Sequence, residues 1–215
     1  MTTEYLRSTE EVVAAYVALR SRVIALVRSR QESDGDLPVP HCPAWRVRDL
    51  VAQMVGGPED VLAGRLEGVA TDAWTQAQVD RHRGDTLAQL ADAWEATIEP
   101  FDVVLPMIPA PVNSQLVLDA VTHEHDLRHA LGVPDARDGG DVVVAIGWVL
   151  HTADAKKPGT ADRLLAAGLD DFDLLRVSSG RRSREQIEAL GMEVALIELL
   201  TEGTPVAPPE TSVVE

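Results

Sequence analysis

The chain has 215 residues, enough for one domain with a sizeable core, or for one domain and a small appendage. Hydrophobic residues make up 45% of it and aromatic residues only 4%, so the core must be built mainly from alanine, valine and leucine, a mixture that favours helices. The formal net charge of −16 argues against nucleic acids and anionic membrane surfaces as partners, because both depend on clustered lysine and arginine.

Three further features bear on the cellular compartment. Cys42 is the one cysteine, so an intrachain disulfide is excluded. The N-terminus lacks the basic-then-apolar pattern of a signal peptide, and no apolar run approaches membrane-spanning length. These features predict a cytoplasmic protein, and they leave open whether it is a monomer or a homodimer.

Two helices are expected in the first third of the chain. Apolar residues at helical spacing predict a long amphipathic helix over residues 9–30. Residues 31–43 contain three prolines and no helical periodicity, which predicts irregular structure. A second helix is expected from about residue 45 to residue 66, with a break or kink at residues 56–58, Gly-Gly-Pro.

The next two helices follow a polar stretch. Residues 74–83 are polar and are expected to be partly loop, and a third helix is predicted over residues 85–98. A fourth helix over residues 112–131 ends at Gly132, with Pro134 beyond it, which is a typical C-terminal signal. Four helices therefore account for the first two-thirds of the chain.

The sequence of the last third of the chain predicts shorter elements. Residues 141–153 are rich in valine and suit a strand as well as a helix, but Trp148 and Thr152 continue a helical stripe and favour the helix. Short helical pieces separated by glycines are expected over residues 160–167, 172–177, 183–190 and 192–200. We therefore predict an all-α protein in three parts: residues 1–134, a bundle; residues 135–202, a helical extension packing on it; and residues 203–215, a disordered tail.

The fourth predicted helix carries the group with the clearest chemistry. Asp119, His123 and Asp126 stand at positions i, i+4 and i+7, so their side chains fall within about 60° of one another on the helix. A carboxylate and an imidazole one turn apart are a common pair of metal ligands, and a further carboxylate can orient the imidazole. His125 and His129 lie on a different side of the helix and are expected to be ordinary surface residues.

Three segments together resemble one protein family. Residues 42–54, CPAWRVRDLVAQM, resemble the second-helix signature of the DinB-like, mycothiol-dependent maleylpyruvate isomerase family. Residues 119–132 resemble its fourth-helix signature, and residues 179–186, SGRRSREQ, resemble a C-terminal motif of the same group. The resemblance spans roughly residues 10–200, and the segments occur in the family's order.

The resemblance implies a DinB-like four-helix bundle with a divalent metal, most often zinc, near one end. Its ligand positions fall on Gln53, Asp119 and His123, with Gln53 where the family has a histidine. The implied function is that of a mycothiol-type, thiol-dependent metalloenzyme, an isomerase or transferase acting on a small electrophilic substrate. In that mechanism Asp126 orients His123, and Arg181 or Arg182 holds a substrate carboxylate.

A second function stays open on the sequence. An amide oxygen is a weak neutral ligand, so Gln53 also suits a metal-free member of the same fold that binds a small ligand or regulates a partner. Each of these residues also has a plainer interpretation, whatever the function. His123 could simply bond to Asp119 or Asp126 of its own helix, Gln53 is expected to be a solvated side chain, and a solvated basic turn explains Arg181 and Arg182 equally well. Cys42 is expected to have a packing or incidental role in either case.

Overall fold

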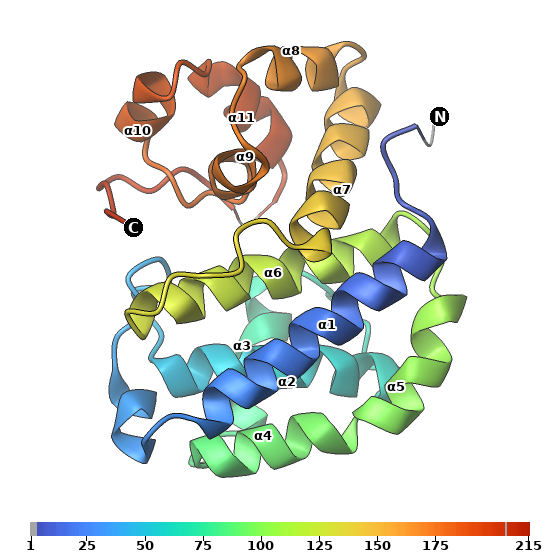
Figure 1. Cartoon of the computed structure of the whole chain (residues 1–215), viewed down its shortest axis with the longest axis vertical. Coiled ribbons are helices and arrows are strands. Elements are labelled where there is room, and N and C mark those ends of the chain that lie inside the picture. The colour runs from blue at the N-terminus through green and yellow to red at the C-terminus, as the bar shows by residue number, and fades with distance from the viewer. Residues whose placement is uncertain (1–3, 205) are drawn as a thin grey trace. The chain divides into compact units, whose positions relative to one another are not determined.

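The structure is a computed structural model that describes residues 4–204 and 206–215 (Figure 1). In this part of the chain we find eleven α-helices and two short 3-10 helices, and no strand. The only β-type pairing between the described residues is one antiparallel bridge, Pro38 to Arg46. The predicted all-α class is therefore confirmed.

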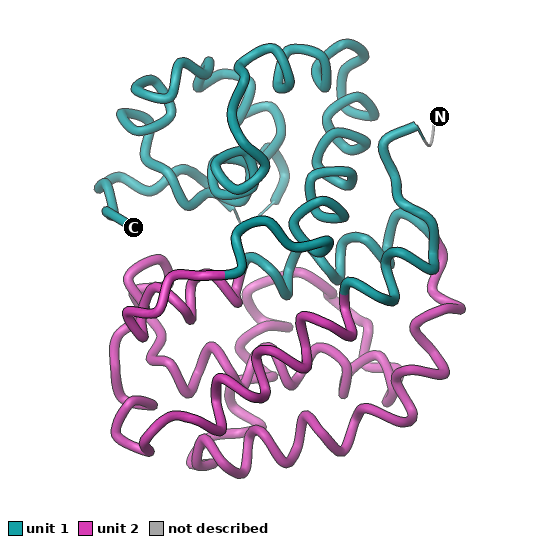
Figure 2. Tube along the Cα trace, viewed as in Figure 1, with its two compact units in different colours: residues 1–15, 110–122, 136–215 teal, residues 16–109, 123–135 magenta. Residues whose placement is uncertain are grey.

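The helices form two compact units (Figure 2). One unit consists of Tyr16–Pro109 and His123–Asp135, and we call it the Cys42 unit. The other consists of the N-terminal segment through Ala15, Ala110–Thr122 and Ala136–Glu215, and we call it the C-terminal unit. The expected boundary after residue 134 lies next to the change of unit at residue 136, but the sequence did not predict that parts of two early helices belong to the C-terminal unit.

Helix α2 (Val47–Ala63) is the centre of the Cys42 unit. It contacts η1 (Glu32–Asp36), α3 (Asp72–Arg81), α4 (Leu87–Ala96) and α5 (Ile98–Val104). The apolar stripe expected from its sequence is buried, because it faces these neighbours. The stripe consists of Val47, Leu50, Val51, Met54 and Val55.

Arginines of α1 (Thr9–Arg28) fix this long helix to others within the Cys42 unit. Arg20 is 2% exposed and forms a two-pronged ion pair with Asp102, at 2.9 and 3.1 Å. Arg22 pairs in the same way with Glu124, which has no exposed surface. Since a buried charge without a partner is strongly destabilising, these pairs define how α1 packs.

Helix α6 (Val112–Ala130) carries the candidate site. Its later part is buried on every side: each residue from 120 to 128 is buried. His125, expected at the surface, is therefore a core residue, 3% exposed. Because these buried residues are consecutive, this part of the helix has no exposed face that the periodicity of its sequence could reveal.

Helix α7 is central in the C-terminal unit and confirms the choice of helix over strand. It contacts α8, α9 and α11, and α10 contacts α11. Tyr5 runs across it at Gly147, where a Cβ would lie 2.4 Å from the backbone oxygen of Tyr5, so only glycine allows this approach. The bounds are α7 Gly140–Lys156, α8 Thr160–Ala166, α9 Asp171–Ser178, α10 Arg184–Ala189 and α11 Val194–Thr201.

Three local expectations differ from the structure. The polar stretch expected to be partly loop is helix α3, because the Thr71 side chain accepts a hydrogen bond from Trp74 N and caps it. Helix α2 continues through residues 56–58 without interruption. The third predicted helix is divided at Thr97 into α4 and α5.

The C-terminal tail, residues 203–215, was expected to be disordered; its described residues, 203–204 and 206–215, lack helix or strand. It is held by hydrogen bonds to α10 and to the turn before it, among them one between Ser212 Oγ and Ser183 Oγ at 2.7 Å. None of the helices in the described ranges combines the length and the apolarity that crossing a bilayer requires.

Candidate metal centre

Cys42 lies at the tip of a tight loop that leads into α2. Backbone hydrogen bonds fix the base of this loop, from Val39 N to Trp45 O at 3.1 Å and from Val47 N to Leu37 O at 2.9 Å. Cys42 N itself donates to Val39 O at 3.0 Å. Cys42 therefore lies in a loop whose conformation is fixed by backbone hydrogen bonds.

His123 and Asp126 face the Cys42 loop from helix α6. They are three residues apart, and His123 Nδ1 lies 3.3 Å from Asp126 Oδ2. The indole of Trp45, from the same loop, lies against the imidazole with ring centroids 6.0 Å apart. Local helix geometry thus pairs the histidine with the aspartate, and the loop covers one side of the pair.

The three side chains converge on one point. Cys42 Sγ lies 3.7 Å from Asp126 Oδ2, the same oxygen that His123 Nδ1 approaches. One ligand atom from each residue lies within 4.8 Å of the other two, and Asp126 has no exposed surface. A catalytic cysteine, histidine and aspartate would stand in line, with the imidazole between the other two, so this convergent geometry is typical of metal ligands instead.

The distances fit a tetrahedral zinc-type ion. With the usual zinc–ligand bond lengths, two edges of the tetrahedron are about 3.3 Å for nitrogen to oxygen and about 3.5 Å for sulfur to oxygen. The corresponding distances in this structure are 3.3 and 3.7 Å. Thiolate, imidazole and carboxylate are also the donors that zinc takes in proteins, so the residues present fit the ion.

The ligand positions implied by the family resemblance do not coincide with this cluster, and only His123 belongs to both sets. Asp119 lies one turn before His123 on α6 and is exposed. Gln53 lies in α2 and is 2% exposed, so the expectation of a solvated glutamine was wrong. Among the described residues, the group of three potential ligands that includes His123 contains Cys42 and Asp126 and does not contain Asp119.

The two arginines singled out by the sequence have different environments in the C-terminal unit. Arg181 Nη1 donates to the Ser179 carbonyl at 2.6 Å. Arg182 is 8% exposed, and its Nη1 lies 2.8 Å from a carboxylate oxygen of Glu215. Arg182 is thus not part of a solvated turn.

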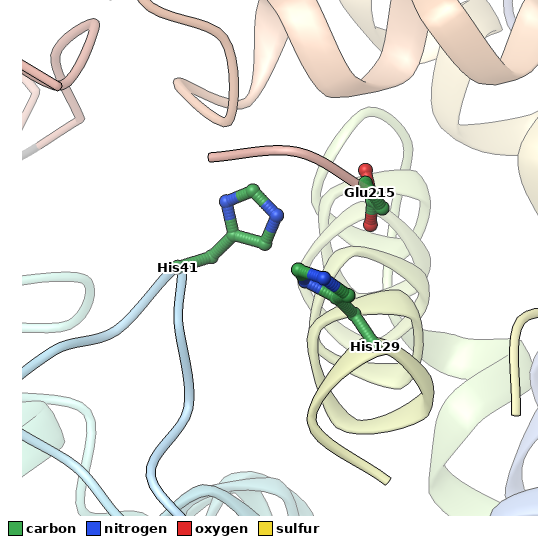
Figure 3. A group of neighbouring side chains, drawn as sticks. All are labelled: His41, His129 and Glu215. Atoms are coloured by element: carbon green, nitrogen blue, oxygen red, sulfur yellow. The ribbon is translucent and has the colours of Figure 1, made fainter. Parts of the chain in front are cut away.

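Sequence reasoning missed Cys42 as a candidate metal ligand. Its 84-residue separation from Asp126 hides the contact, and the only local signal is a cysteine in a proline-containing loop before a helix. The adjacent His41 is also turned toward α6, where its ring lies beside that of His129 with centroids 5.1 Å apart (Figure 3).

Comparison with known proteins adds no relative. The chain matches no protein-family model, no curated protein and no solved structure among those compared.

Proposed function

We propose that this chain is a thiol-dependent metalloenzyme, an isomerase or transferase on a DinB-like four-helix bundle, whose divalent ion is held by Cys42, His123 and Asp126. Zinc is the ion that this donor set suits best. One observation carries the proposal: a thiol, an imidazole and a carboxylate from two separate segments meet within 4.8 Å.

The number and charge of these ligands suit catalysis. Three protein ligands leave one position of a tetrahedral ion open, which is the arrangement of catalytic rather than structural zinc sites. A thiolate from Cys42 and a carboxylate from Asp126 would balance the two positive charges of the ion, so the loaded centre would be neutral overall.

Each residue has a distinct part in the proposal. Asp126 and Cys42 supply negative charge, neutral His123 supplies a nitrogen ligand, and the Trp45 indole excludes water from one face of the imidazole. When bound, the ion supplies a lowered pKa for a low-molecular-weight thiol such as mycothiol, which makes a nucleophilic thiolate available at neutral pH. The electrophile is a small substrate with an activated double bond.

Cobalt substitution tests the ligand set. We expect the untagged, metal-free protein to take up one Co²⁺ and to show the near-ultraviolet charge-transfer band of a cobalt–thiolate bond. Cys42→Ser should abolish this band. Cys42→Ser, His123→Ala and Asp126→Asn should each weaken binding by about a hundredfold or more, since losing a residue that merely orients a ligand already costs about 10–100-fold.

Two further variants separate this ligand set from the one that the family resemblance implies. Asp119→Asn and Gln53→Ala should leave Co²⁺ affinity within about twofold of the wild type, well below the loss of about 10–100-fold for an orienting residue. If they weaken binding while Cys42→Ser does not, the ion is held by Gln53, Asp119 and His123 instead. Circular dichroism of every variant checks that the helices are intact.

A metal-free binding or regulatory protein is the second candidate function, and Gln53 at the family's histidine position favours it. The two candidates differ in turnover. We expect the zinc-loaded protein to accelerate adduct formation between mycothiol and maleylpyruvate, and His123→Ala to remove the acceleration. Absence of both stoichiometric zinc and acceleration would contradict the metalloenzyme proposal.

A further inference from the structure

A pocket opens in the Cys42 unit where α2 ends and α3 packs beside it. Its volume of about 540 Å³ is usual for a site that binds a small molecule, and its lining includes Gly64, Arg65, Leu66, Glu67 and Trp74. Helix α2 has 17 residues, so its two ends lie about 25 Å apart, and the Cys42 loop precedes the opposite end. The pocket is therefore separate from the candidate metal centre.

Buried Asp60 fixes an arginine at this pocket. Asp60 is 2% exposed, and its Oδ1 accepts from Arg65 Nε at 2.6 Å and from the two Nη groups of Arg81 at 2.7 and 2.8 Å. Gln78 Nε2 donates to the other carboxylate oxygen at 2.9 Å. Arg65 is thus held through its Nε, while its two Nη groups bond to no residue in the described part of the chain.

Arg65 therefore offers a free pair of donors to a ligand. The two Nη groups of a guanidinium lie in one plane and match the two oxygens of a carboxylate. The Arg65 side chain is 49% exposed, so a ligand reaches it without breaking the ion pair with Asp60. Arg81 also lines the pocket, but both its Nη groups bond to Asp60 and its Nε lies 3.4 Å from Glu59.

Negative charge lies in the same pocket. Glu67 is part of the lining, and within the described ranges it forms no hydrogen bond or ion pair. Gly64 ends α2, and the C-terminal end of a helix carries partial negative charge. The carboxylate and the helix end together favour a cationic group such as an ammonium.

Two apolar side chains complete the site. Leu66 is 52% exposed, although it is a large apolar residue. The indole Nε1 of Trp74 donates to the backbone oxygen of Arg65 at 2.9 Å, which fixes the ring at the pocket. Exposed apolar side chains at a pocket favour a ligand that removes their surface from water.

We infer that this pocket binds a free α-amino acid with an apolar side chain. The Nη groups of Arg65 hold the carboxylate, and Glu67 together with the end of α2 holds the ammonium group. Leu66 and Trp74 contact the side chain. A ligand with a single charge leaves either Arg65 or Glu67 without its partner, so the site discriminates against it. This inference goes beyond the proposed enzymatic function and requires no metal.

Titration with L-phenylalanine tests the inference. We expect binding with a dissociation constant below about 1 mM, and a loss of about tenfold or more for Arg65→Gln and for Glu67→Gln, because each removes a charge-assisted contact. The readouts are calorimetry and the shift of the Trp74 indole N–H resonance. The matched controls are Arg83→Gln and Glu99→Gln, the same changes at exposed residues outside the pocket, which should bind as the wild type does.

Two analogues assign each charge to its residue. Hydrocinnamate lacks the ammonium group and phenethylamine lacks the carboxylate, so both should bind the wild type at least about tenfold more weakly than phenylalanine. Glu67→Gln should not weaken hydrocinnamate binding further, and Arg65→Gln should not weaken phenethylamine binding further. Cys42→Ser should bind phenylalanine as the wild type does, which separates this site from the metal centre.

Glu67→Gln keeps the test valid even if Arg65→Gln folds poorly, because Glu67 lies in an exposed turn. Circular dichroism checks the helices of both variants. The inference is overturned if the wild type does not bind phenylalanine at millimolar concentrations, or if hydrocinnamate binds as tightly as phenylalanine. It is also overturned if the control variants weaken binding as much as Arg65→Gln and Glu67→Gln do.

Discussion

His82 shows how single contacts in this protein depend on pH. Its Nδ1 lies 2.8 Å from Asp85 Oδ2, and its Nε2 lies 3.1 Å from Glu59 Oε2, which Arg81 also approaches at 3.4 Å. The hydrogen bond to Glu59 is the largest influence, and it raises the pKa of His82 above its usual value, against the opposing effect of partial burial. The imidazolium thus links the second half of α2 to the turn between α3 and α4.

The raised pKa of His82 predicts a pH-dependent stability. A raised folded-state pKa gives a stabilisation that is complete below the unfolded value of about 6.5 and is lost as the pH rises through the folded-state pKa. We expect His82→Gln to lower the free energy of unfolding by at most about 1 kcal/mol at low pH, because its partners Glu59 and Asp85 reach solvent, which screens the pairs, and by less at high pH. Urea denaturation of both proteins at about pH 5.5 and about pH 8.5, on either side of the ordinary histidine pKa, measures this.

Glu59→Gln provides the control for this assignment. It removes the contact that raises the pKa of His82 most, so the effect of His82→Gln should shrink in that background at low pH. An effect of His82→Gln that is equal at both pH values, or larger at the higher one, would contradict the charged contact.

At the scale of the elements, α2 and α3 approach closely at a glycine. A Cβ on Gly56 would lie 2.5 Å from the Cβ of Gln78, whereas a Cβ on Gly57 would meet nothing within 4 Å. Gln78 is fully buried and donates to Asp60 Oδ2 at 2.9 Å, so its side chain cannot move aside freely. Packing against α3 therefore excludes a side chain at Gly56, whereas the structure leaves room for one at Gly57.

Alanine substitutions at these two glycines should have opposite effects. We expect Gly56→Ala to destabilise the protein by about 1–3 kcal/mol, because α2 and α3 have to separate to make room. Gly57→Ala should stabilise it by up to about 1 kcal/mol, because alanine favours the helix and the position is open. Chemical denaturation of the two variants measures both signs, and a Gly56→Ala variant as stable as Gly57→Ala would refute the close contact.

At the scale of the whole molecule, the chain has 35 acidic side chains and 19 lysines and arginines, which gives the net charge of −16. The buried ion pairs described above use a small part of this charge, and the remaining carboxylates repel one another over the surface. Self-repulsion of this kind destabilises the folded state most at low ionic strength.

Salt should therefore stabilise the protein. Raising NaCl from about 10 mM to about 150 mM shortens the Debye length from about 30 Å to about 8 Å. We expect the melting temperature to rise by about 2–4 °C, equivalent to about 1 kcal/mol for a chain of this size. Thermal unfolding followed by circular dichroism measures the rise, and a fall would mean that screening of the attractive surface pairs outweighs relief of repulsion.

The sequence by itself determined most of the helices. Apolar periodicity located α1 and α2, the glycine and proline beyond α6 marked its end, and a helical stripe favoured helix for α7. It also placed His123 and Asp126 on one face, because their relation depends only on the geometry of a single helix. The polar helix α3 lacks such a stripe, so its short length and its cap were not enough to predict it.

Only the tertiary structure decided which distant residues meet. Cys42 joins His123 and Asp126 because a loop before α2 lies against α6, and Glu215 reaches Arg176 because the tail returns to α9. The burial of Gln53 and His125 arose in the same way, from neighbouring elements. Local propensity fixes the conformation of a segment, but the contacts between segments follow from packing within each compact unit, and the proposed metal centre consists of such contacts.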